Sequence, residues 1–186
     1  MASIVGICNI ALGRAGITDK IANIDTEQSV PALWCKTHYQ DCLDRVLRDF
    51  PWGFATKTEN LSQIDEGVYL YPSDCLNVVS VDGKNDFHIE MTGVGTNQRK
   101  IIRTSGSEVK YVARVNDPNL FDSLFISTLA WLMASELSLS VGGNNTQRAQ
   151  YAYQQYELSK SSAQRASIME GGEKPFNNDE FLKARD

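Results

Sequence analysis

The imidazole bases available for chemistry near neutral pH are His38 and His88. A nucleophilic triad would add a Ser or Cys beside one of them and a carboxylate to orient it. His38 falls in a stretch of helical periodicity among polar residues, and His88 falls in a predicted strand beside a glycine-containing loop. Such positions are typical of solvated surface, and we predict no catalytic role for either histidine.

Paired carboxylates could also perform hydrolysis. Asp41 and Asp44 are three residues apart in a predicted helix, but Arg45 and Arg48 alternate with them. Acidic and basic residues at this spacing are typical of a solvated helix face with local ion pairs. We therefore expect these carboxylates to be structural.

The sequence contains no recognisable metal-binding or nucleotide-binding motif. The four cysteines, Cys8, Cys35, Cys42 and Cys75, lack zinc-knuckle spacing and are predicted to be buried small residues in a reducing compartment. The segment GVGTNQ lacks the third glycine of a dinucleotide loop, and neither GxxxxGK, GxSxG nor HExxH occurs. The sequence predicts no catalytic residue, no metal and no cofactor, and hence a protein that is not an enzyme.

The amino-acid composition limits which classes of protein the chain can belong to. The 186 residues are 42% hydrophobic and 22% charged, which is ordinary for a globular chain. No run approaches the roughly 20 apolar residues of a membrane span, and the N-terminus lacks a basic leading region, so no membrane association is predicted. The net charge of -5 argues against sequence-reading DNA binding, but suits a surface past which DNA slides.

Four helices are predicted from apolar residues recurring at three and four positions. The first is capped by Ser3 and ends at Gly16, and the second runs from Ser29 to Pro51. The third begins at Asp117 with Pro118 in its first turn, and the fourth spans about 146–168. The third has the broadest apolar face, which predicts a central helix.

Between Trp52 and about Arg114 the apolar period falls toward two, with turn signals between short segments. This pattern predicts four to six short strands in one small antiparallel sheet covered by helix. The predicted fold is α+β: a four-helix bundle, residues 1–51 and 116–170, with a β insertion at 52–115 between helices two and three. Residues 171–186 are predicted to form an extended C-terminal docking tail.

The two parts meet at a corner, DFPWGFATKTENLS, that contains Pro51, Trp52 and Phe54 within four residues. Proline fixes φ, and each buried ring contributes about 2–3 kcal/mol. A base-stacking platform is the other role for aromatic residues here, but no basic residue lies between them. We expect the corner to hold the two parts rigidly together.

Residues 3–83 resemble phage neck proteins. The shared elements are SIVGICNIALGRAGI with Leu-Gly-x-x-Gly, an acidic-Ser linker, a helix with an Ala and a Tyr seven residues apart, the Pro-Trp-x-Phe-Ala corner, and YLYPSDCLNVVSVDG. This pattern is similar to that of the head-to-tail adaptors called tail tubular protein A in short-tailed phages. Over residues 117–170 the resemblance is one of architecture only.

The resemblance implies a virion protein, made in the host cytoplasm and located in the neck between capsid and tail. Family members form a homo-oligomeric ring, commonly of twelve copies, beneath the portal protein. The ring extends the channel through which genomic double-stranded DNA passes, and offers a platform to the tail nozzle or tail tube protein. The family carries out no catalysis and binds no cofactor.

The tail carries the docking residues that we predict. Phe176, Phe181 and Leu182 stand on a polar segment too short to fold alone, which is typical of anchors that order on a partner. The resemblance suggests the portal or the next adaptor subunit; an incidental terminus is the plain alternative. Two other functions remain open: another neck component, such as a stopper or head-completion protein, and a small hydrolase using His38 or His88.

Overall fold

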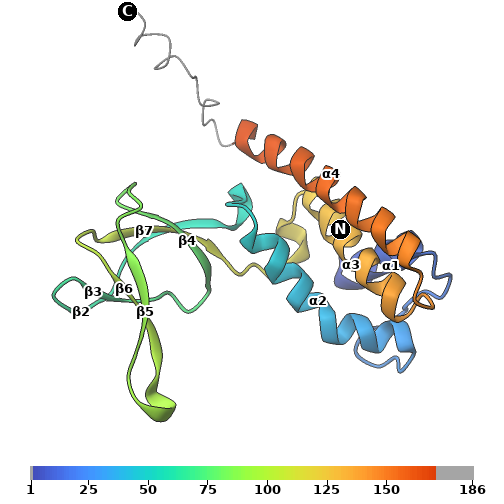
Figure 1. The fold of residues 1–186 in the computed structure, drawn as a ribbon, viewed down its shortest axis with the longest axis horizontal. Helices are drawn as coiled ribbons and strands as arrows, with labels where there is room; N and C mark the ends of the chain where they lie inside the picture. Colours follow the sequence, from blue (N-terminus) through green and yellow to red (C-terminus); the bar gives the residue numbers. More distant parts are fainter. Residues whose placement is uncertain (1, 171–186) are drawn as a thin grey trace, which may run out of the picture.

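The computed structural model describes residues 2–170. Figure 1 shows the helices gathered on one side and the strands on the other. Helix α2 runs from the helical side toward the strands, and the chain turns the corner at its end. Residues 171–186, with the predicted docking residues Phe176, Phe181 and Leu182, lie outside the described residues.

Local capping defines the helix ends. Helix α1 spans Ile4–Ala15, where Ser3 Oγ accepts a hydrogen bond from the Gly6 amide at 3.0 Å and Gly16 adopts φ 74°. Helix α2 spans Val30–Arg48 and has Ser29 as its N-cap. Helix α3 spans Ser123–Ser140 and α4 spans Thr146–Glu170. Three short 3₁₀ turns are present: η1 Gly53–Ala55, η2 Gly95–Asn97 and η3 Pro118–Leu120.

The start of α3 differs from the prediction. Asp117 and Pro118 open the short turn η3, and the chain then extends before Asp122 caps the helix itself. The Asp122 carboxylate accepts from the amides of Leu124 and Phe125 at 2.7 and 3.4 Å. Aspartate is a favourable N-cap residue at both points, and Pro118 favours the first of them, so the sequence pattern alone does not say which one begins the long helix.

Helix α3 lies at the centre of the helices and contacts α1, α2 and α4. By length and composition it could cross a membrane, but 56% of the segment is buried within the molecule. Burial on several sides explains its apolar character without a bilayer.

Within residues 2–170, seven strands form two antiparallel sheets. The first sheet has the order β1-β7-β4 and the second has the order β2-β3-β6-β5. The strands are β1 Thr56–Asn60, β2 Gln63–Asp65, β3 Val68–Leu70, β4 Cys75–Val81, β5 His88–Thr92, β6 Arg99–Arg103 and β7 Glu108–Ala113.

Strands β4 and β7 of the first sheet carry apolar residues on both faces, whereas most of β1 is exposed. On β7, Val109 and Tyr111 join a core shared with Ile102 of the second sheet, while Val112 joins the core of the helices. On β4, Val78 lies in the inter-sheet core and Val79 packs toward the helices. The molecule is therefore layered as helices, first sheet and second sheet.

The predicted four-helix bundle with one small inserted sheet is wrong. The β region contains two sheets, because one face of the first sheet is covered by helices and the other requires an apolar layer of its own. Helix α2 is not a regular bundle member either, since it packs on α3 and also contacts β4 and β7. The fold remains a combination of helices and antiparallel strands.

Candidate functional site: the junction of helices and sheets

The corner after α2 is closed by local hydrogen bonds. Trp52 Nε1 donates to the Val46 carbonyl at 2.8 Å, which satisfies one of the carbonyls left open at a helix end. The Trp52 carbonyl accepts from the Ala55 amide at 2.9 Å and from Thr56 Oγ1 at 2.8 Å. Pro51 is exposed, so its contribution is the fixed backbone angle, whereas Trp52 is only 2% exposed.

Five aromatic rings form one cluster at this corner. Trp52 meets Phe125 of α3 edge-on with ring centroids 5.1 Å apart, and Phe54 meets the same ring at 4.9 Å. Phe50 lies 5.2 Å from Trp52, and Phe121 lies 5.7 Å from Phe54. These spacings are those of favourable aromatic pairs. The cluster joins the end of α2, the start of the first sheet and the start of α3 in one packed unit.

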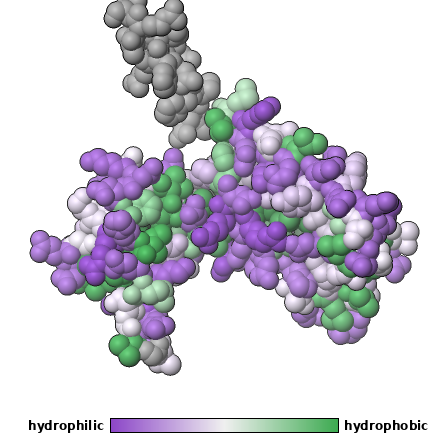
Figure 2. All heavy atoms as spheres, viewed as in Figure 1, coloured by the Kyte–Doolittle hydropathy of each residue, from purple (hydrophilic) through white to green (hydrophobic). Residues whose placement is uncertain are grey.

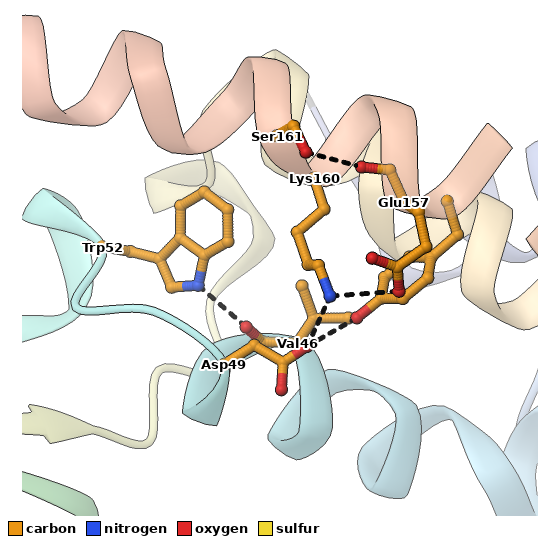
Figure 3. Close-up of polar contacts among 7 residues, drawn as sticks. Val46, Asp49, Trp52, Glu157, Lys160 and Ser161 are labelled. Atoms are coloured by element: carbon orange, nitrogen blue, oxygen red, sulfur yellow. Dashed lines mark hydrogen bonds and ion pairs between the residues drawn. The ribbon is translucent and has the colours of Figure 1, made fainter. Parts of the chain in front are cut away.

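A polar network on the other side of the corner attaches α4 (Figure 3). Asp49, the C-cap residue of α2, accepts a hydrogen bond from the buried Tyr156 hydroxyl at 2.6 Å. Lys160 Nζ lies 3.5 Å from Asp49 Oδ2 and 3.1 Å from Glu157 Oε1. Ser167 Oγ accepts from the Gly53 amide at 3.1 Å. Long-range contacts thus hold α4 to the corner over several turns.

This network changes the titration of its members. Burial raises the pKa of Tyr156, and the hydrogen bond to the Asp49 carboxylate raises it further. For Lys160, burial lowers the pKa, but the hydrogen bond to Glu157 and the charge of Asp49 outweigh it, so the net shift is upward. Both groups remain protonated at neutral pH and serve as donors between α4 and α2.

A second feature of the junction is a charged groove of about 640 Å³ between α2 and the strands. Figure 2 shows strongly hydrophilic residues gathered where the two sides of the molecule meet. The groove brings together His38, Asp41 and Asp44, whose side chains are the types that act as acids and bases. The other residues that line it are Arg45, Arg48, Cys75, Leu76, Lys100, Arg114 and Glu136.

The charges in the groove are paired across the fold. Arg114 donates to both carboxylate oxygens of Asp44, at 3.1 and 2.5 Å, and Arg45 forms an ion pair with Glu136 of α3. The predicted local pairing along α2 is therefore wrong, because both pairs join residues far apart in the sequence. Bidentate arginine–carboxylate contacts fix geometry as well as charge, so the groove acts as a further tie between the layers.

The groove does not assemble a nucleophilic site. His38 stacks on Trp34, with ring centroids 4.7 Å apart, and within residues 2–170 no carboxylate is hydrogen-bonded to it. Burial raises the pKa of the Cys42 thiol to about 12 and also raises that of Cys75, so both thiols are protonated at neutral pH. His88 lies exposed on β5 and is not part of the groove lining.

Some of the most exposed apolar side chains lie on the β5–β6 hairpin and on α4. Ile89, Met91 and Val94 are 46%, 60% and 88% exposed on the β5–β6 hairpin, which Figure 1 shows as an arm extending from the strands. Leu158 and Met169 are 63% and 82% exposed on α4. The sequence pattern did not predict this arm. Alternation of apolar and polar residues indicates that one face of a strand is covered, but it does not indicate the direction in which a hairpin extends.

Two of the three basic residues of α4 bind other groups of the molecule, and the third, Arg165, is exposed. Arg148 Nη1 donates to the Ala15 carbonyl at 3.0 Å, and Lys160 is held by Asp49 and Glu157 as described above. Arg14 similarly lies 4.2 Å from the ring centroid of Trp131. A basic helix face suited to gripping DNA does not result from this arrangement of α4.

Comparison with protein-family models and with curated proteins finds no match to this chain. Among residues 2–170, no cluster of three or more His, Cys, Asp or Glu side chains is placed to hold a metal ion.

Proposed function

We propose that the protein is a structural head-to-tail adaptor of a phage neck. The observation that supports this most is the junction: an aromatic cluster, an α4 network and two long-range ion pairs hold helices and sheets as one body. A subunit that transmits force between capsid and tail needs such stiffness. The resemblance of residues 3–83 to neck proteins suggests where this stiffness would be needed, namely between capsid and tail.

In this proposal the subunits form a ring, commonly of twelve copies, beneath the portal protein. Genomic double-stranded DNA passes through the ring without sequence-specific contacts, which is compatible with a net charge of -5 and with basic α4 residues engaged internally. The tail nozzle or tail tube protein binds the opposite end. The protein is located in the virion neck, and it works without a cofactor or a catalytic step.

The outward features provide the contact surfaces. The β5–β6 arm presents exposed Ile89, Met91 and Val94 to a neighbouring protein. Phe176, Phe181 and Leu182 of the C-terminal segment are proposed to anchor the portal or the next subunit. Aromatic anchors of this kind carry a large share of interface energy, so their removal tests the proposal directly.

Mass photometry of the purified protein mixed with portal rings encoded by the same genome tests the ring. The expected gain is about 250 kDa per portal, twelve times the chain mass of 20.7 kDa. The triple change of Phe176, Phe181 and Leu182 to Ala is expected to abolish the gain. The double change of Asn177 and Asn178 to Ala, in the same segment, is the matched control and should leave it intact.

Portal rings that never gain mass from the unaltered protein would refute the proposal. A gain that appears only below a separate adaptor ring, located by a low-resolution reconstruction of the particle, would instead identify a stopper. Unchanged infectivity of a variant in which His38 and His88 are both changed to Ala would exclude the small hydrolase. We expect infectivity to be unchanged in that variant.

A further inference from the structure

A cavity of about 220 Å³ lies at the point where the described chain leaves α4. One wall is formed by the corner and η3, and includes Phe54, Leu120 and Phe121. The other wall is the last two turns of α4, and includes Ala163 and Ala166. Leu120 is 58% exposed although it faces this apolar space. The small residues on α4 leave room that an additional side chain could fill.

The size and chemistry of the cavity fit one phenylalanine side chain. An apolar cavity of about 150 Å³ is enough to bind benzene in a well-studied case. The aromatic residues that line the space belong to the five-ring cluster of the corner. A further ring would extend that cluster with the same edge-to-face geometry.

The sequence supplies such a ring within reach. Glu170 lines the cavity and is followed by GGEKPF, so Phe176 is six residues along the chain. Six residues span at most about 20 Å, and the pair of glycines allows the chain to reverse after the helix. Pro175 restricts the conformations of its neighbours, which lowers the entropy lost when Phe176 is fixed. Phe181 would have to close a longer loop.

Charge at the rim agrees with this assignment. The carboxylates of Asp122 and Glu170 both line the cavity. Glu173 and Lys174 precede Phe176 in the sequence, so docking of Phe176 would bring one charge of each sign to the rim, where Lys174 could pair with a carboxylate.

We propose that Phe176 docks into this cavity of its own subunit, so that the unassembled protein holds its C-terminal segment against the corner. The inference does not depend on the proposed function, since it concerns the isolated chain. In a neck adaptor it would mean that a partner must compete with the cavity for Phe176. The segment would then become available for docking only when the partner is present.

Limited proteolysis of the full chain with chymotrypsin tests this directly, because the enzyme cleaves after phenylalanine. The reference is a synthetic peptide of residues 171–186. We expect cleavage after Phe176 to be about tenfold slower in the protein than in the peptide, because cleavage follows the population of the open form. The rate of cleavage after Phe181 in the protein should differ from the rate in the peptide by less than about twofold.

Ala166→Leu fills the cavity and should raise cleavage after Phe176 to the rate of the peptide. A variant in the C-terminal segment gives a second test that does not depend on the folding of Ala166→Leu. Phe176→Ala should speed hydrogen exchange of amides 163–170, and the matched Phe181→Ala should not. Equal cleavage at both phenylalanines, relative to the peptide, would overturn the proposal. Protection that rises with protein concentration would overturn it too, because it would show that a second copy provides the ring.

Discussion

Replacement of Trp52 tests whether the corner holds the molecule together. The side chain is 2% exposed, and its Nε1 donates a hydrogen bond to the Val46 carbonyl at 2.8 Å. A tryptophan buries about 200 Å², which at about 25 cal/mol per Å² is an upper bound near 5 kcal/mol. Measured truncations of buried aromatic residues cost about 3–5 kcal/mol. We therefore expect Trp52→Ala to lower the free energy of unfolding by about 4 kcal/mol.

Trp52→Phe separates the contributions to this loss. It keeps a ring beside Phe125 but removes the donor to Val46, so we expect a loss of about 2 kcal/mol. Leu158→Ala on α4 is the matched control, since that side chain is 63% exposed and its loss should change stability by less than about 0.5 kcal/mol.

Urea unfolding followed by far-UV circular dichroism measures these free energies, because the signal does not depend on the tryptophan that is removed. In thermal unfolding, the Trp52→Ala loss corresponds to a fall in Tm of about 8–16 °C for a chain of this size. A loss below about 1 kcal/mol for Trp52→Ala would refute the reasoning, because it would mean that helices and sheets are held together without the corner.

Three further predictions concern contacts between distant segments. Tyr156→Phe should cost about 1.5–3 kcal/mol, since it removes the hydroxyl that donates to Asp49. Gly16→Ala should destabilise by about 1–3 kcal/mol, because φ is 74° and a Cβ would meet the Arg148 guanidinium; the cost should be smaller in an Arg148→Ala background. Asp74→Asn should weaken the acid dependence of stability: burial raises the pKa of Asp74, but hydrogen bonds lower it overall, so its contribution is present at neutral pH and lost as pH falls through the range near and below 4.

Urea unfolding measures all three effects, for Asp74→Asn as a series from neutral to acidic pH. Tyr153→Phe is the control for the first, since Tyr153 is 49% exposed. Gly13→Ala is the control for the second and should be neutral or stabilising, because a Cβ there meets nothing within 4 Å. Asp19→Asn, on an exposed loop residue, should leave the pH profile unchanged. An equal cost of variant and control in any pair would contradict the contact invoked.

The sequence by itself determined the helices, because their signals act over a few residues. The stripe in residues 4–15, the serine caps and the left-handed Gly16 all lie within one turn of the ends that they define. The same holds for the hairpin β5–β6, whose strands are adjacent in the chain. The aromatic residues of the corner were also recognisable as buried types, since Trp52 and Phe54 follow a proline at the end of an apolar stripe.

Only the tertiary structure decided how the strands are arranged. Strand β1 pairs with β7, about fifty residues away, and β7 also pairs with β4. The last strand in the sequence therefore lies at the centre of the first sheet. Ile101 and Ile102 are both buried on opposite faces of β6. Alternation shows which residues share a face, but the number of layers depends on which faces need covering once the chain has collapsed.

The charged residues show the same division. The spacing of acidic and basic residues predicted that Asp44 and Arg45 are surface charges. In the structure their partners are Arg114 and Glu136, because the corner brings the end of β7 and the middle of α3 against α2. Likewise, the position of Arg148 over Gly16 depends on how α4 packs on α1. Local patterns fix the conformation of each segment, whereas pairing across the chain is decided by the shared cores that those segments form when they meet.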